Sequence, residues 1–278
     1  MSLRPEGRVP QDLHDHVLAG QQPGFLPYPV RDAATVALVR DAPGGMQVYL
    51  LRRVAGMAFA GGMHVFPGGS VDRADATADI AWAGSPPAAW AADFGTDEPM
   101  ARALVCAAVR ETFEESGVLL AGPAAGEVLA DVSTDEWEAE RADLEARAFS
   151  LSELLARRGL VLRADLLRPL AHWITPVVEP RRFDTRFFLA EVPSGQVCRD
   201  AGSEADQRVW IRPRDALDQG VTLLPPTAAV LEELAAYDDV AGALAAPRTV
   251  LPVLPRLMIA DSGEVALLMP GQPGHEGP

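Results

Sequence analysis

Three glutamates crowd into five positions near the middle of the chain, in the stretch VRETFEESGV. On a helix, at about 100° per residue, Glu111, Glu114 and Glu115 fall within an arc of roughly 100° and form one acidic stripe. Val105 and Phe113 fall on the opposite side, where they would face a core. Carboxylates four residues apart can share one hard divalent cation, because such cations take oxygen ligands. The residue types therefore indicate either a cation site or a solvated acidic face.

The position of the stripe favours the cation site. The predicted helix starts near Pro99 and ends at Ser116, so the glutamates lie in its last turns, where the helix dipole disfavours negative charge. Arg110 is the only basic side chain close to them in the sequence, whereas a stabilising acidic stripe usually has Lys or Arg four residues on. Mutual repulsion at such a place becomes useful when a cation binds there.

Strands and further helices surround this stretch and must position it. The runs AATVALVR and MQVYLLRR, separated by the turn signal DAPGG, predict a hairpin of strands at 34–40 and 46–53. The glycine-rich stretch FAGGMHVFPGGSVD predicts a loop that enters a strand at 63–66 and leaves through PGG. Later segments predict a helix over 134–158, strands in RFFLAEVP and QRVWIRP, and helices that open at Pro213 and Pro225. Strands mixed with helices predict an α/β or α+β fold.

Composition narrows the class of protein. The chain has 278 residues, of which 48% are hydrophobic, so it can bury a substantial core in one large domain or two small ones. A formal net charge of −15 argues against a nucleic-acid partner, because such binding relies on Lys and Arg to neutralise phosphates. No apolar run reaches the roughly 18 residues of a membrane-spanning helix, so we expect no membrane partner. Two cysteines without CxxC spacing suit a reducing interior, and the expected location is cytoplasmic.

The stretch RETFEESGV resembles the second half of the Nudix box, G-x5-E-x7-R-E-U-x-E-E-x-G-U, in which U is aliphatic. Its charged positions and its glycine are matched, and Thr112 at an aliphatic position is a mild departure. The first half resembles FPGGSVD: with Gly69 as the box glycine, the acidic residue six positions on is Asp75, where the pattern has Glu. Residues 76–109, 34 in number, separate Asp75 from Arg110 where the pattern has seven, so a 27-residue insertion interrupts the box.

In having an interrupted box, the sequence resembles one branch of the Nudix hydrolase family, the branch that includes the peroxisomal coenzyme A diphosphatase. The stretches LLRR, HWITP, RRFDTRFFLA and LLPPT also look like that branch, and the resemblance covers roughly residues 33–235. It implies an α/β/α sandwich with a mixed β-sheet plus helical insertions. We expect an irregular arm at 1–30, a Nudix domain at 31–215 with insertions near 73–99 and 122–170, and a C-terminal helical or extended segment at 216–278 packed on the same domain.

The resemblance implies hydrolysis of a diphosphate linkage in a nucleoside diphosphate joined to another moiety, with Mg²⁺ or Mn²⁺ as the cofactor. Carried over by position, Glu111 and Glu115 would be metal ligands, and Glu114 a ligand or a water-positioning group. A carbonyl of Gly68 or Gly69 would add a backbone ligand. The metal would neutralise charge on the diphosphate and lower the pKa of the attacking water.

Other residues receive roles from the same resemblance. Arg110 would orient a box glutamate through a charge-assisted hydrogen bond. The general base is either Glu204, in the loop before RVWIRP, or Glu179, in the loop before RRFD. Basic residues near the glycine loop and in the RRFDTRFF block are candidates for contact with substrate, and they are Arg52, Arg53, His64, Arg181, Arg182 and Arg186.

The branch favours coenzyme A or an acyl-CoA as the substrate, which would give 3′,5′-ADP and (acyl-)phosphopantetheine. The alternatives are a pyrophosphatase of NADH, ADP-ribose or nucleotide sugars, and a non-catalytic Nudix sensor that only binds a nucleotide. Sensors usually lose box glutamates, and all three helix glutamates are present here, which favours an enzyme. The expected partner is a small-molecule nucleoside diphosphate, and a homodimer is left open.

Overall fold

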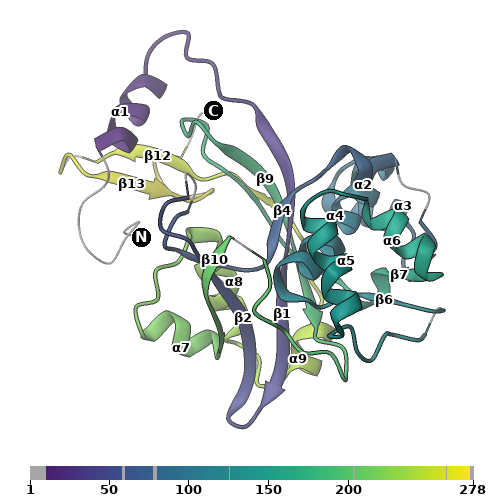
Figure 1. The fold of residues 1–278 in the computed structure, drawn as a ribbon. Helices are drawn as coiled ribbons and strands as arrows, with labels where there is room; N and C mark the ends of the chain where they lie inside the picture. Colours follow the sequence, from purple (N-terminus) through teal and green to yellow (C-terminus); the bar gives the residue numbers. More distant parts are fainter. Residues whose placement is uncertain are drawn as a thin grey trace.

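The computed structural model describes residues 11–57, 60–77, 80–124, 126–202, 204–260 and 262–275. Within these ranges the chain forms an eight-stranded mixed sheet with helices on both faces (Figure 1). The strands follow one another in the order β10 (Ala205–Ile211), β2 (Gly45–Arg53), β1 (Val30–Ala42), β9 (Arg182–Glu191), β8 (Arg168–Ile174) and β11 (Pro252–Val253). The short strands β3 (His64–Val65) and β4 (Gly68–Ser70) pair with β2 and β1. The predicted α/β/α sandwich with a mixed sheet is confirmed.

Strand β1 organises the sheet. It pairs antiparallel with β2, as the predicted hairpin requires, and parallel with β9. Because side chains alternate between the faces of a strand, Val36 and Leu38 point to one core cluster while Ala37 and Val39 point to the other. Both faces of β1 are therefore buried, which explains its continuous apolar run.

Helix α4 (Glu98–Ser116) lies on one face of this sheet, and the predicted helix ending at Ser116 is confirmed. The Asp97 carboxylate accepts a hydrogen bond from the Met100 N–H at 2.8 Å, which satisfies a donor of the first turn. Gly117 ends the helix with a φ of 71°, a conformation that favours glycine. The same side of the molecule carries α2 (Arg73–Thr77), α3 (Pro87–Phe94), α5 (Asp135–Glu145), α6 (Leu151–Arg158), η1 (Ala164–Leu166) and a small sheet of β5 (Trp82–Ala83), β6 (Ala121–Gly122) and β7 (Val161–Arg163).

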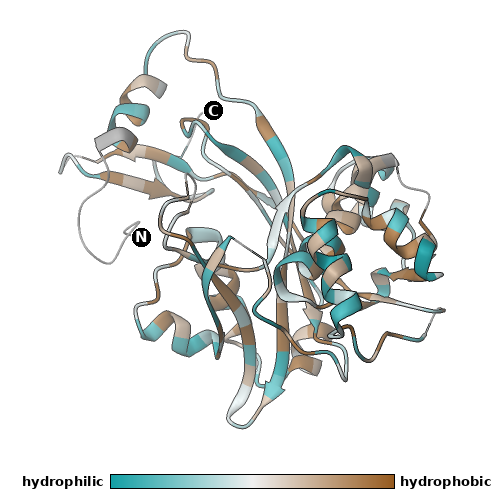
Figure 2. Ribbon diagram, viewed as in Figure 1, coloured by the Kyte–Doolittle hydropathy of each residue, from teal (hydrophilic) through white to brown (hydrophobic). Residues whose placement is uncertain are grey.

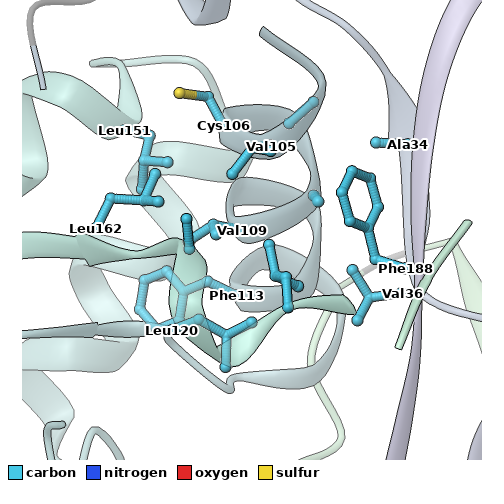
Figure 3. Packing of buried hydrophobic residues seen from close by; sticks show 14 of the residues in the cluster. Ala34, Val36, Val105, Cys106, Val109, Phe113, Leu120, Leu151, Leu162 and Phe188 are labelled. Carbon is cyan, nitrogen blue, oxygen red and sulfur yellow. The ribbon is translucent and has the colours of Figure 1, made fainter. Parts of the chain in front are cut away.

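The apolar side of α4 is fully buried. Val105, Val109 and Phe113 point into a cluster with Leu162 on one side and Phe188 of β9 on the other (Figure 3). None of these five side chains is exposed. The prediction that this side of the helix faces the core is confirmed.

The opposite face of the sheet is covered by helices from the C-terminal third of the chain. These are α7 (Pro213–Asp218), α8 (Pro225–Leu234) and α9 (Val240–Ala245). Leu231 and Leu234 of α8 pack with Leu50 of β2 and Leu189 of β9 in a second core cluster. The helices on both faces carry hydrophobic and hydrophilic residues in alternation (Figure 2), as expected for elements that pack on a sheet and meet water outside.

Two expectations about the connecting segments are wrong. Within the arm expected to be irregular, Gln11–Gly20 forms helix α1, because Val17 packs against Val178 and the hairpin of β12 (Arg256–Ile259) and β13 (Val265–Leu268); residues 1–10 lie outside the described residues. The 73–99 insertion contains α2 and α3, in agreement with the expected helical insertions. The single helix expected over 134–158 is two, because Arg147 adopts a φ of 59° and Ser150 starts α6 with a capping box. No described helix is long and apolar enough to cross a membrane.

Candidate active site

The glycine-rich stretch and the acidic stripe lie against each other. The Gly68 N–H, in β4, donates a hydrogen bond of 2.7 Å to the Glu115 carboxylate in α4. At Gly69 a Cβ atom would lie 2.5 Å from Glu111 Oε1, so only glycine fits there without displacing that carboxylate. The short strand β4 forms because this segment pairs antiparallel with β1, with Thr35 opposite Gly68. The sheet thus fixes FPGG next to the last turns of the helix.

A buried ion pair closes the interrupted motif. Arg110 donates to both carboxylate oxygens of Asp75, at 3.2 Å from Nε and 2.9 Å from a terminal nitrogen, and Asp75 is only 3% exposed. The same guanidinium donates to the Ser70 carbonyl at 3.0 Å and to Glu111 at 2.6 Å. Arg110 therefore joins the glycine stretch, Asp75 and the acidic stripe, although residues 76–109 separate them in sequence.

A small cavity of about 50 Å³ opens beside the stripe. Its apolar and main-chain lining comes from Leu51 and from the segment around Ala201, Gly202 and Ala205. Five carboxylates also line it, and they are Glu111, Glu114, Glu115, Glu145 and Glu204. The volume suits a few water molecules or a hydrated cation rather than an organic group.

Burial and mutual repulsion disfavour negative charge in this cavity. Burial, together with repulsion from Glu111 and Glu145, raises the pKa of Glu114 to about 7 against the opposing pull of Arg110. Burial likewise raises the pKa of Glu111, and it raises the pKa of Glu115 well above its ordinary value, with Glu204 repelling both. A group of carboxylates that repel one another would gain from a cation between them.

The donor set fits a hard divalent cation, because it consists of the carboxylate oxygens of the five glutamates that line the cavity. Among the described residues, no three acidic, His or Cys side chains are already arranged to hold a metal ion. Arg110 and the Gly68 N–H bind oxygens of Glu111 and Glu115 that a cation would share. The ligand roles of the three helix glutamates and of the Gly68 or Gly69 carbonyl stay predictions.

The two candidates for the general base lie in different places. Glu204 lines the cavity, and its carboxylate forms an ion pair with Arg53 at 2.8 Å. Glu179 lies in the turn between β8 and β9, next to Val178, which packs against Val17 of α1. Only Glu204 therefore lies among the described residues that line the cavity.

The basic residues of β2 and β3 divide between the two faces of the sheet. Arg53 lies on the cavity face with Leu51, two residues before it. Arg52 points to the other face, and His64 pairs with it across β2 and β3. The structure thus brings Arg53 to the carboxylates, through Glu204, and does not bring Arg52 or His64 there.

The arginines of RRFDTRFF are used inside the protein. Arg186 is 6% exposed and pairs with Asp184 at 2.5 Å and Asp32 at 3.2 Å. Arg182 is buried and donates to two main-chain carbonyls, at 2.8 and 3.1 Å. Arg181 is exposed, in the turn before β9. Arg182 and Arg186 thus have the internal partners that a buried guanidinium needs. The expected contact of this block with substrate stays a prediction.

Sequence reasoning missed three residues that lie close to the C-terminal end of α4 but come from other parts of the chain. Glu145 lines the cavity from helix α5. Arg141, one turn before it, donates to the Glu114 carbonyl at 2.7 Å. Arg199 lies against Gly117, where an added Cβ would meet its guanidinium at 2.7 Å. No signal in the sequence marks them, because α5 resembles any solvated helix of alternating charge.

Gly69→Ala tests the close approach of the glycine turn to the stripe. The new methyl group would displace the Glu111 carboxylate, and we expect turnover to fall by about 10²-fold, since small displacements of a catalytic group have effects of that order. The matched control is Gly56→Ala, because a Cβ there meets nothing within 4 Å. Steady-state rates and melting temperatures of both variants make the measurement. Equal activity of the two variants would show that Glu111 does not need its present position.

Comparison with known proteins points to one family. The family profile "NUDT19 Nudix domain" matches residues 86–227, which is 142 of the 278 residues. Acyl-coenzyme A diphosphatase NUDT19 of Gallus gallus is 30% identical over 70% of this chain and 65% of its own length. Putative nudix hydrolase 7 of Caenorhabditis elegans is 28% identical over 70% of this chain and 57% of its own length. The chain thus spans less than two thirds of each of these relatives.

A solved structure shows the same fold. The crystal structure of a NUDIX hydrolase from Alicyclobacillus acidocaldarius superposes with a TM-score of 0.69 and is 32% identical in sequence. The match covers 80% of this chain and 98% of that one. The shared architecture is therefore not confined to a single motif.

Proposed function

The chain belongs to the Nudix hydrolase family, and from this premise we propose that it hydrolyses the diphosphate linkage of coenzyme A or an acyl-CoA with the help of Mg²⁺ or Mn²⁺. The observation that carries the proposal is the gathering of Glu111, Glu114, Glu115 and Glu204 around one cavity beside Gly68 and Gly69 of strand β4. In such a site a bound cation supplies neutralisation of the diphosphate charge and orients the attacking water. Glu111 and Glu115 would hold it, with Glu114 as a ligand or a water-positioning group.

The chain's own residues supply the remaining functions. Glu204 accepts the proton of the attacking water, and Arg53 holds the Glu204 carboxylate at the cavity through its 2.8 Å ion pair. Arg110 fixes Glu111 through its 2.6 Å hydrogen bond. The water oxygen forms a bond to one phosphorus, the bond from that phosphorus to the bridging oxygen breaks, and the other phosphate leaves. The products are 3′,5′-ADP and phosphopantetheine, or its acyl form.

The choice of substrate is supported by relatives and not by the geometry of the site. The Gallus gallus relative bears the name acyl-coenzyme A diphosphatase, and the interrupted box is similar to the same branch. A pyrophosphatase of NADH, ADP-ribose or nucleotide sugars would use the same carboxylates. Binding of a nucleotide without cleavage is disfavoured, because Arg110 and all three helix glutamates are present and lie together.

A substrate panel separates these alternatives. The purified protein is incubated with coenzyme A, acetyl-CoA, NADH, ADP-ribose and a nucleotide sugar, each with Mg²⁺, Mn²⁺ or EDTA, and products are identified by mass spectrometry. We expect cleavage that depends on the metal, with coenzyme A or acetyl-CoA giving the highest kcat/KM. A kcat/KM for coenzyme A far below that for NADH or ADP-ribose would refute the substrate and leave the diphosphatase intact. Absence of cleavage with either metal would refute the diphosphatase.

A further inference from the structure

The C-terminal end of helix α4 carries negative charge that the helix dipole disfavours. Glu114 and Glu115 lie in its last turn, where main-chain carbonyls lack helical partners and the dipole is negative. The helix itself has no basic residue in that turn. Arg110 compensates one turn earlier, where its guanidinium is already shared with Asp75. Positive charge for the helix end must therefore come from another part of the chain.

Helix α5, from an insertion that the Nudix box does not include, supplies that charge. It lies beside α4 (Figure 1), and its Arg141 is only 6% exposed. One terminal nitrogen of Arg141 donates to the Glu114 carbonyl at 2.7 Å and to the Glu145 carboxylate at 2.9 Å. Arg141 thus binds the main chain of the acidic turn and a fifth carboxylate of the cavity with one nitrogen.

A second arginine reaches the same helix end and is linked to the first. The main-chain N–H of Arg199 donates to the Ser116 carbonyl at 2.8 Å, and the guanidinium of Arg199 lies against Gly117. Glu138 of α5 joins the two, because it accepts 2.7 and 2.9 Å hydrogen bonds from Arg141 and lies 3.3 Å from Arg199. Glu138 thus links Arg141, whose side chain donates to the Glu114 carbonyl, with Arg199, whose main-chain N–H donates to the Ser116 carbonyl.

We propose that Arg141 is a positioning residue of the carboxylate site: it fixes the last turn of α4 and holds Glu145 at the cavity, and so sets the affinity of the site for a divalent cation. The inference rests on the proposed function, since it assumes that the cavity binds such a cation. It extends that function by making an inserted helix part of the site. Side chains that orient ligands in this way typically change metal affinity by about 10- to 100-fold when removed.

The test measures Mn²⁺ binding directly, by calorimetric titration of the metal-free protein, together with kcat and KM at saturating Mn²⁺. For Arg141→Gln we expect Mn²⁺ affinity to fall by about tenfold or more and kcat to fall, with KM for the substrate nearly unchanged. Arg141→Lys should recover part of the affinity, because an ammonium can still donate to the Glu114 carbonyl although it cannot also bridge two glutamates. Circular dichroism and melting temperatures establish that each variant is folded.

Arg158→Gln is the matched control. Arg158 also pairs with two glutamates of α5, Glu136 and Glu140, at 2.8 and 2.9 Å. Its loss should lower the melting temperature without changing Mn²⁺ affinity. If Arg141→Gln and Arg158→Gln bind Mn²⁺ as tightly as the wild type, Arg141 is merely structural and the inference is overturned.

The two proposals fail in different ways. A wild type that binds Mn²⁺ but cleaves no diphosphate would refute the proposed function, while weaker binding by Arg141→Gln would still support the positioning role. A wild type that cleaves its substrate, with Arg141→Gln unchanged in Mn²⁺ affinity and kcat, would refute only the positioning role. A wild type that binds no Mn²⁺ or Mg²⁺ would overturn both.

Discussion

Glu115→Gln is expected to lower kcat by about 10³-fold or more while the protein stays folded. Removing one carboxylate from the proposed cation site would forfeit several kcal/mol of charge stabilisation in the transition state, and each 1.4 kcal/mol is about tenfold in rate. Gln keeps the size of the side chain, and its amide oxygen can still accept the Gly68 N–H. Because burial and Glu111 both disfavour the Glu115 charge, the metal-free variant should melt no lower than the metal-free wild type.

Glu98→Gln provides the control for that variant. Glu98 lies in the first turn of the same helix, is exposed, and falls outside the box. Its substitution should leave kcat unchanged and affect the melting temperature only slightly, since exposed charges near a helix terminus contribute well under about 1 kcal/mol. Kinetics at saturating Mn²⁺ and thermal unfolding in EDTA make the comparison. Full activity of Glu115→Gln would show that the metal ligands have been assigned to the wrong residues.

Asp75→Ala is expected to produce the largest loss of stability. It leaves a buried guanidinium without its bidentate partner, and breaking a buried pair typically costs about 3–5 kcal/mol. We expect the lower part of that range, because Arg110 keeps its contact with Glu111. For a domain of this size the melting temperature should fall by roughly 6–12 °C. Activity should fall as well, since Arg110 then no longer ties the helix to the glycine stretch.

Two further variants make that result specific. Asp75→Asn removes the charge and keeps an oxygen that can accept from Arg110, so its loss of stability should be smaller. Asp72→Ala removes a partly exposed acid from the same segment, whose 3.5 Å pair with the exposed Arg147 should contribute less than about 1 kcal/mol. If chemical unfolding gives the same free energy for Asp75→Ala and Asp72→Ala, the two halves of the motif are not held together by the Arg110–Asp75 pair.

Local patterns predicted the central sheet and helix well. The alternation of turn signals and apolar runs identifies the hairpin of β1 and β2, and the glycine after Ser116 identifies the end of α4. The spacing of Glu111, Glu114 and Glu115 places them on one stripe, and the structure does gather them at one cavity. These features depend on residues close in sequence, for which periodicity and capping are informative.

Long-range packing was beyond the reach of those patterns. Nothing local indicates that Arg186 is buried and paired with Asp32 and Asp184. The burial of the acidic stripe is a second example: Glu111 and Glu114 are only 13% and 12% exposed, because strand β4 and other residues distant in sequence lie against them. Helix α5 reads as an independent insertion, and its contact with the end of α4 appears only in three dimensions.

Metal-dependent cleavage of a diphosphate by the stripe of Glu111, Glu114 and Glu115 is the core of the proposed function. To test it, wild type and Glu115→Gln are incubated with coenzyme A in Mn²⁺ or EDTA, and products are quantified by mass spectrometry. We expect equal amounts of 3′,5′-ADP and phosphopantetheine from the wild type with Mn²⁺, and essentially none with EDTA or from the variant. Cleavage by Glu115→Gln at the wild-type rate, or cleavage that persists in EDTA, would contradict it.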